Sequence, residues 1–225
     1  MPNESRDSHQ AKISECGHAY ARALLDGDEW AAEIAIREAI DARLTTGEID
    51  EEIIAPALWL IGELWERNQL SVADEHLATE ISIRMLALLR EARRTILARG
   101  GHRVLLAAPP GEMHVVALTM TGDLLREAGY DTVMLGADVP ARDLAGVAKR
   151  HRAEVICLTA TLPDAVARAQ RSIDEVRRQR PHAGFVLGGR GTSRGWPRQP
   201  LVERCERVSE VVDAVDAIVK RAALN

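Results

Sequence analysis

Residues 103–135, RVLLAAPPGEMHVVALTMTGDLLREAGYDTVML, carry the pattern that decides the fold. A short apolar run comes first at 103–108, an amphipathic stretch follows at 115–128, and a second apolar run closes the segment at 132–135. Apolar runs of strand length on either side of a helix predict two parallel strands joined by a helical crossover.

The same alternation continues to the end of the chain. Further strands are predicted at 155–158, 184–187 and, more weakly, 207–208, and further helices at 141–151, 164–179 and 209–222. Strands that alternate with helices predict a doubly wound parallel sheet, which binds ligands beyond the carboxyl ends of its strands. We therefore predict a Rossmann-like, flavodoxin-like α/β domain with a five-stranded parallel sheet over residues 100–225.

The first hundred residues have a different character, with apolar residues at helical spacing and no strand-like alternation. Helices are predicted at 11–25, 29–44, 49–66 and 71–99. Ser71, with Asp74 three residues later, forms a shortened capping box at the start of the fourth helix. Short connections favour antiparallel neighbours, so we predict a four-helix bundle over residues 11–99, after a disordered polar tail at 1–10.

The composition fits a globular protein and argues against several other classes of protein. Of 225 residues, 46% are apolar and 28% charged, which is enough for a sizeable core. The net charge of −5 lacks the footprint of a nucleic-acid binder, and three cysteines form no disulfide framework. There is no apolar stretch of membrane-spanning length and no signal peptide, so we expect a cytoplasmic protein. Trp30 and Trp59 are expected in the bundle core.

Polar or small residues follow three of the predicted strands. Glu112 and His114 follow the first strand, Thr159 and Thr161 the third, and the Gly188-Gly189 pair the fourth. A carboxylate beside a histidine fixes the imidazole tautomer and makes it a better metal ligand. An exposed loop histidine is an equally good interpretation, and the threonines and glycines alone are more typical of caps and turns.

A second group lies in the helical half. Trp65 ends the third predicted helix, and Glu75 and His76 lie in the first turn of the fourth. The turn between these helices brings an aromatic ring, a carboxylate and an imidazole to one end of the bundle. Taken alone, the group is better explained by core packing of Trp65 and by the favourable position of Glu75 at a helix N-terminus.

The features occur together and in order, and in combination they resemble a known family. Gly111-Glu112-Met113-His114, Thr159-Ala160-Thr161 and Gly188-Gly189 resemble the Asp-x-His-x-x-Gly, Ser-x-Leu and Gly-Gly signatures of cobalamin-binding Rossmann-like domains. The string WERNQLSVADEHLATE, residues 65–80, resembles the Trp-x9-Glu-His signature of B12-dependent photoreceptors of the CarH/LitR type.

The resemblance implies adenosylcobalamin as the cofactor, bound with its own base displaced. His114 would be the lower axial ligand of cobalt, Glu112 its partner, and Trp65, Glu75 and His76 the cap over the adenosyl group. The remaining implied cofactor contacts are Gly111, Met113, Val115, Ala117, Thr159, Thr161, Leu162, Gly188, Gly189 and Gly191. The implied protein is a light-sensing regulator without catalytic activity, in which photolysis of the cobalt–carbon bond alters packing, assembly or partner binding.

The sequence departs from the family pattern at several positions. Glu112 replaces the usual Asp, Ala117 the final Gly, and Thr159 and Thr161 the Ser-x-Leu pair. Glu66 stands where CarH-type proteins have a histidine that can ligate cobalt after photolysis. Only about ten polar residues precede the first predicted helix, so we expect no DNA-binding domain of the CarH type and no direct DNA binding. We expect output through self-association, as a homodimer or larger homo-oligomer, or through a downstream protein.

Three other functions agree with the same sequence features. Stand-alone photocobilins, which this layout also resembles, pair cobalamin with a bilin such as biliverdin. A corrinoid, methyl-carrying subunit of a methyltransferase system has a similar domain order. A light-independent B12-sensing adaptor would have the same sequence features as a photoreceptor.

Overall fold

The computed structural model describes residues 2–93, 101–194 and 199–223. The chain divides into two compact units, Met1–Arg94, here the helical unit, and Thr95–Asn225, here the sheet unit. Gly100, at the predicted junction, lies outside the described residues, as do positions 94–99 of the fourth predicted helix. None of the helices in the described ranges is both long enough and apolar enough to cross a bilayer.

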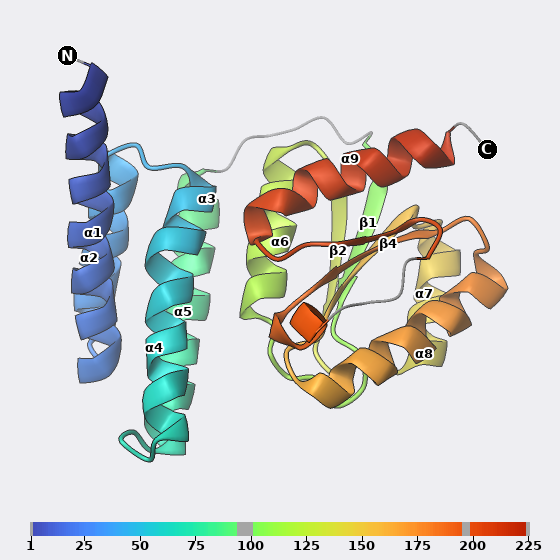
Figure 1. The fold of residues 1–225 in the computed structure, drawn as a ribbon, viewed down its shortest axis with the longest axis horizontal. Coiled ribbons are helices and arrows are strands. Elements are labelled where there is room, and N and C mark those ends of the chain that lie inside the picture. Colours follow the sequence, from blue (N-terminus) through green and yellow to red (C-terminus); the bar gives the residue numbers. More distant parts are fainter. Residues whose placement is uncertain (1, 94–100, 195–198, 224–225) are drawn as a thin grey trace. The chain divides into compact units, whose positions relative to one another are not determined.

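Antiparallel helices build the helical unit (Figure 1). Its elements are α1 (Pro2–Asp26), α2 (Glu29–Asp41), α3 (Thr46–Glu48), the π-helical segment η1 (Ile49–Ile54), α4 (Ala55–Glu66) and α5 (Val72–Ala92). The segments α3, η1 and α4 follow one another without a break, so the predicted number of four long helices is confirmed. The capping box at α5 is also present, since Ser71 Oγ accepts from the Asp74 amide at 3.2 Å.

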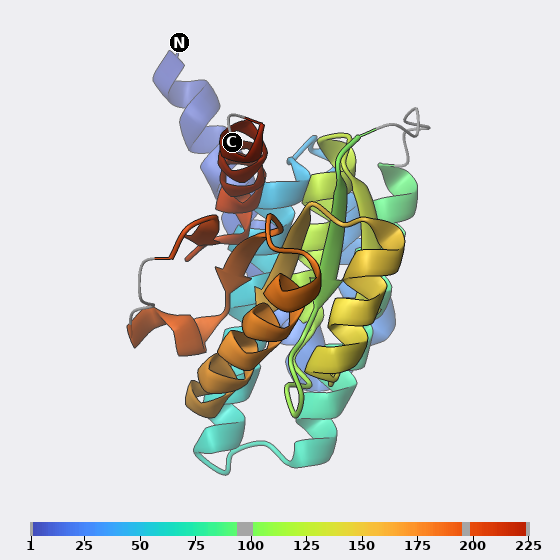
Figure 2. The ribbon, with the colours of Figure 1, turned by 90° about the vertical axis from the view of Figure 1, so that its right-hand side faces the viewer.

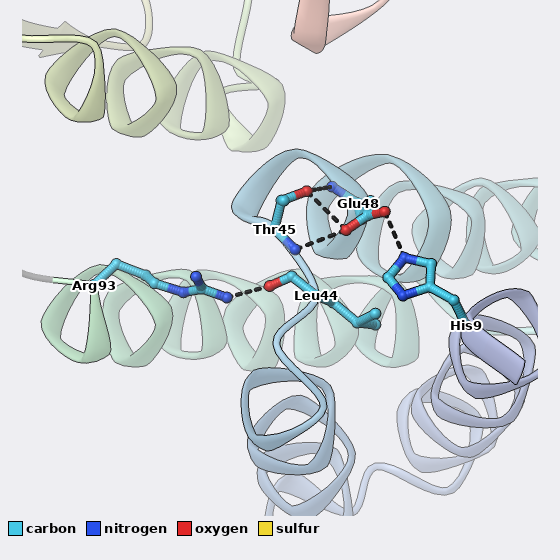
Figure 3. Close-up of polar contacts among 5 residues, drawn as sticks. All are labelled: His9, Leu44, Thr45, Glu48 and Arg93. Atoms are coloured by element: carbon cyan, nitrogen blue, oxygen red, sulfur yellow. Dashed lines mark hydrogen bonds and ion pairs between the residues drawn. The ribbon is translucent and has the colours of Figure 1, made fainter. Parts of the chain in front are cut away.

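The start of the chain is helical rather than disordered. The helix α1 begins at Pro2, so the prediction of disorder is wrong for residues 2–10. His9 Nε2 lies 2.7 Å from Glu48 Oε1, and Lys12 Nζ donates to Glu38 Oε2 at 3.0 Å. Figure 3 shows His9 reaching the cap that Thr45 and Glu48 form at the start of α3. These contacts to two other helices hold the early turns of α1 in place.

The prediction that Trp30 and Trp59 belong to the core is wrong. Trp30 is 74% exposed and Trp59 57% exposed. On α2 the buried side is formed by small and branched residues, among them Ala32, Ala35 and Ile36. With 3.6 residues per turn, Trp30 falls on the opposite side of this helix.

The sheet unit is a five-stranded, all-parallel sheet with the strand order β2-β1-β3-β4-β5. The strands are β1 (Arg103–Ala107), β2 (Asp131–Gly136), β3 (Val155–Thr159), β4 (Gly184–Gly188) and β5 (Val202–Arg204), and the helices are α6 (Val116–Glu127), α7 (Ala141–His151), α8 (Pro163–Gln179) and α9 (Val211–Ala222). The predicted fold class, an all-helical domain followed by a Rossmann-like domain, is confirmed.

Helices cover both faces of this sheet. Residues of α7 and α8 share one apolar cluster with the sheet, and residues of α6 and α9 share another. Figure 2 shows α7 and α8 in front of the strands. The doubly covered sheet explains why its central strand β3 is buried at all five positions.

The fifth strand lies earlier than predicted. It covers Val202–Arg204, whereas residues Val208–Glu210 form a short 3-10 turn, so the prediction at 207–208 is wrong. The Glu210 carboxylate accepts hydrogen bonds from the amides of Glu206, at 2.9 Å, and Arg207, at 3.3 Å. A side chain that bonds the preceding backbone favours a turn over a strand at this point.

Candidate functional site

The loop between β1 and α6 lies at the carboxyl edge of the sheet and carries Glu112 and His114. Glu112 is completely buried, and it contacts His114 twice. Its Oε1 lies 2.6 Å from His114 Nδ1 and accepts a 3.0 Å hydrogen bond from the His114 amide. Its Oε2 accepts from the amides of Thr161, at 2.7 Å, and Leu162, at 3.3 Å. The carboxylate therefore joins two loops that are almost fifty residues apart in sequence.

These contacts fix the ionisation state of Glu112. Burial alone would raise the pKa of its carboxyl, but the contacts with the His114 ring, the His114 amide and the Thr161 amide outweigh burial and lower that pKa from 4.5 to about 2. The carboxylate is thus charged at neutral pH and holds a proton on His114 Nδ1. In a neutral imidazole with its proton on Nδ1, Nε2 is the nitrogen that can bind a metal.

The His114 ring fits the role of a metal ligand. Its side chain is 56% exposed, although its carboxylate partner is fully buried. An imidazole with one nitrogen held by a carboxylate and with its edge exposed can ligate a metal without leaving a buried group unpaired. The residues therefore fit a cobalt ion held through Nε2. Among the described residues there is no cluster of three or more histidine, cysteine, aspartate or glutamate side chains that could hold an ion by itself.

The loops after β3 and β4 meet beside this pair. Thr159 is buried at the end of β3 and lies opposite Gly188 in the strand register. Thr161 contacts Glu112 through its backbone amide. Gly189 has φ +97°, and a Cβ atom there would lie 2.6 Å from the Ala160 carbonyl oxygen. Gly189 must therefore be glycine for the two loops to pack.

Gly191 shows the same constraint. A Cβ atom at Gly191 would lie 2.6 Å from the Leu162 carbonyl oxygen, and the Gly191 amide donates to Ala160 at 2.9 Å. The close approach that these glycines permit in this structure is between two loops of the protein itself. The other predicted contact residues differ in burial: Met113, Ala117 and Leu162 are exposed, and Val115 packs partly against the core.

The second predicted group lies at one end of the helical unit, where α4 turns into α5 (Figure 1). Trp65, in the last turn of α4, is 46% exposed. Glu75 Oε2 lies 2.6 Å from His76 Nδ1, and Glu75 Oε1 accepts from the Thr79 hydroxyl at 3.0 Å. The His76 side chain is 73% exposed. This pair has the same carboxylate-to-Nδ1 contact as Glu112 and His114.

Sequence reasoning missed Asp138 and Arg168, which both contact Gly111. Asp138 Oδ1 accepts from the Gly111 amide at 2.7 Å. The Arg168 guanidinium lies against Gly111 and is ion-paired with Asp164 one turn earlier in α8. Neither residue belongs to a motif with a chemical signature, and both contacts depend on how the loops pack. Only the placement of Asp138 just beyond the end of β2 could have drawn attention to it.

Two segments of the chain match family models described as a B12 binding domain, residues 17–90 in the helical unit and residues 102–200 in the sheet unit. The HTH-type transcriptional repressor CarH of Myxococcus xanthus is 31% identical over 155 residues, which are 68% of this chain and 50% of CarH. The chain thus spans about half the length of that relative. A corrinoid protein of Desulfitobacterium hafniense is 22% identical over 78% of this chain and 83% of its own length.

Among solved structures, the monomethylamine corrinoid protein of Methanosarcina barkeri has the same fold. The TM-score is 0.78 at 15% identity, over 92% of this chain and 99% of that one. The two domain matches define a cobalamin-binding class of protein. This chain is a cobalamin-binding protein, and each of its two units contains one of the matched segments.

Proposed function

We propose that the protein is a light-sensing regulator that binds adenosylcobalamin with the cofactor's own base displaced. His114 would hold cobalt through Nε2, and Glu112 would keep the proton on Nδ1. Thr159, Thr161 and the Gly188–Gly191 stretch line the path of the nucleotide tail. When bound, the cofactor supplies a photolabile cobalt–carbon bond.

The proposal of light sensing is supported by the group of residues at the α4–α5 turn. Trp65 is exposed although it is a large aromatic residue, and it lies at the same end of the helical unit as the Glu75–His76 pair. In this proposal Trp65, Glu75 and His76 pack against the adenosyl group. Loss of the adenosyl group on illumination would remove this contact, and the helical unit would then favour a different assembly or a different protein partner. A ligand that biases two states in this way is sufficient for a switch.

A second candidate is a corrinoid subunit of a methyltransferase system. It is supported by the corrinoid relative, of which the match covers 83%. In this role the protein would carry a methyl group for a partner enzyme and need not respond to light. A light-independent sensor of cobalamin level would bind the same cofactor and also show no light response.

One experiment separates these functions. Protein loaded with adenosylcobalamin in the dark is studied by absorption spectroscopy and size-exclusion chromatography, before and after green light. We expect a spectrum typical of a histidine-ligated cofactor, a spectral change on illumination and a shift in elution volume. The cobalt–carbon bond is photolabile in itself, so the change in elution volume is the deciding measurement. Binding without a light-dependent change in elution volume would favour the methyl carrier or the cofactor sensor. Absence of binding would overturn the cobalamin assignment itself.

Biliverdin as a second chromophore is tested in a parallel sample. The exposed rings of Trp30 and Trp59 offer surface for a flat chromophore. A new long-wavelength absorption band on addition of biliverdin would support a sensor with two chromophores. An additive spectrum, with no new band, would limit the protein to cobalamin.

Replacement of Trp65 by alanine tests the cap. We expect the preference for adenosylcobalamin over methylcobalamin to fall by about 10-fold, because a large aromatic contact to the adenosyl group is lost. Trp59→Ala is the matched control, since Trp59 lies on the same helix and is also exposed. Both dissociation constants are measured by equilibrium titration in the dark. An unchanged ratio in Trp65→Ala would rule out Trp65 as the cap.

A further inference from the structure

Asp138 bonds the backbone on both sides of the peptide that joins Gly111 to Glu112. Its Oδ1 accepts from the Gly111 amide at 2.7 Å, and its own amide donates to the Glu112 carbonyl oxygen at 3.1 Å. Asp138 lies in the loop between β2 and α7, more than twenty residues beyond Glu112. One residue of a neighbouring loop therefore fixes the backbone from which the Glu112 side chain extends.

The backbone conformation of Asp138 suits an aspartate. Its φ is +54°, a region that most side chains avoid and that aspartate and asparagine tolerate better. The residue is exposed, so burial of an apolar surface does not account for this conformation. The hydrogen bond that its carboxylate accepts from the Gly111 amide compensates for an unfavourable backbone.

Arg168 lies beside Gly111 on another side. Gly111 has φ +73°, and a Cβ atom built there would lie 3.6 Å from each of Cζ, Nε and Nη2 of Arg168. Three equal distances mean that the guanidinium plane lies flat against this residue. Arg168 is held in turn by its ion pair with Asp164. Asp138 therefore bonds the turn before Glu112, and Arg168 lies beside it.

A short series of contacts connects Asp138 to His114, the proposed ligand of cobalt. Asp138 fixes the backbone of residues 111 and 112, and the Glu112 carboxylate contacts the ring of His114 at 2.6 Å. We infer that Asp138 is a positioning residue, which sets the orientation of His114 toward cobalt from outside the Glu112–His114 pair. This inference rests on the proposed role of His114 as the lower axial ligand.

The test compares three substitutions in the full chain. Asp138→Ala removes the acceptor, and Asp138→Gly removes it while also relieving the positive φ. Asp138→Asn keeps an acceptor oxygen and tolerates the same backbone. Asp143→Ala is the matched control, because Asp143 is an exposed aspartate in the first turn of α7.

The probe is cobinamide, which lacks the nucleotide base, so that any axial nitrogen must come from the protein. Each variant is loaded with the cobalt(II) form, and nitrogen superhyperfine splitting in the electron paramagnetic resonance spectrum reports the histidine-bound fraction. We expect full splitting in the wild type, Asp138→Asn and Asp143→Ala. In Asp138→Ala and Asp138→Gly we expect partial loss of splitting and about 10-fold weaker binding.

The outcomes distinguish the role of Asp138 from the role of His114. Full splitting and wild-type affinity in both Asp138→Ala and Asp138→Gly would overturn the role of Asp138 and leave the role of His114 intact. No splitting in the wild type would overturn the assignment of His114, and the role of Asp138 with it. A thermal melt of each unloaded variant separates a defect in ligation from a loss of folding. Restoration by Asp138→Asn would not be expected from a residue needed only for its charge.

Discussion

Replacing His114 with alanine is expected to remove the protein's ligand to cobalt. The bound cofactor should then show the spectrum of a form without histidine, or with its own base, and affinity should fall. Loss of a hydrogen-bond partner of a metal ligand typically weakens binding by about 10–100-fold, and loss of the ligand itself should cost at least that. Absorption spectra and equilibrium titration in the dark measure both effects.

His102 provides a matched control for this substitution. Its Nδ1 lies 2.6 Å from Glu154 Oε2, the same contact that His114 makes with Glu112, and its side chain is 50% exposed. It lies beside the amino end of β1, away from the carboxyl edge of the sheet. His102→Ala should therefore bind cobalamin as the wild type does. If His114→Ala also keeps the wild-type spectrum and affinity, His114 is not the ligand.

Glu112→Gln is expected to have the second-largest effect, and it acts on both binding and stability. The glutamine cannot accept four hydrogen bonds as a carboxylate does, and its amide group would face donors on Thr161, Leu162 or His114. We expect cobalamin affinity to fall by about 10-fold or more. Loss of hydrogen bonds to a buried charge should also lower the unfolding free energy by about 1–3 kcal/mol.

The effect on stability has a characteristic pH dependence. The pKa of Glu112 is lowered to about 2, so its charge stabilises the folded unloaded protein fully above the ordinary value of 4.5. That contribution is lost as the pH falls from about 4.5 toward 2. The wild type should therefore lose its advantage over Glu112→Gln across this range. Hydrogen exchange at the buried amides of Cys157 and Leu158 measures the opening of the sheet unit.

The matched control is Glu154→Gln, since Glu154 also pairs with a histidine but is 46% exposed. A change within about 0.5 kcal/mol is expected there. An advantage of the wild type over Glu112→Gln that stayed constant down to pH 2 would contradict the lowered pKa of Glu112.

The sequence by itself determined the features that depend on neighbours along the chain. The alternation of apolar runs and amphipathic stretches predicted the parallel sheet, because each strand and helix must bury its own apolar face. The Ser71–Asp74 capping box was predictable because its two partners are three residues apart. The pairing of Glu112 with His114 was predictable for the same reason.

Only the tertiary structure decided which groups from distant segments meet. The burial of Glu112 depends on amides at Thr161 and Leu162, and the turn before it depends on Asp138 and Arg168. The exposure of Trp30 depends on which side of α2 faces its neighbours. Such contacts are set by strand order and loop packing, which bring together residues that carry no signal of each other in the sequence.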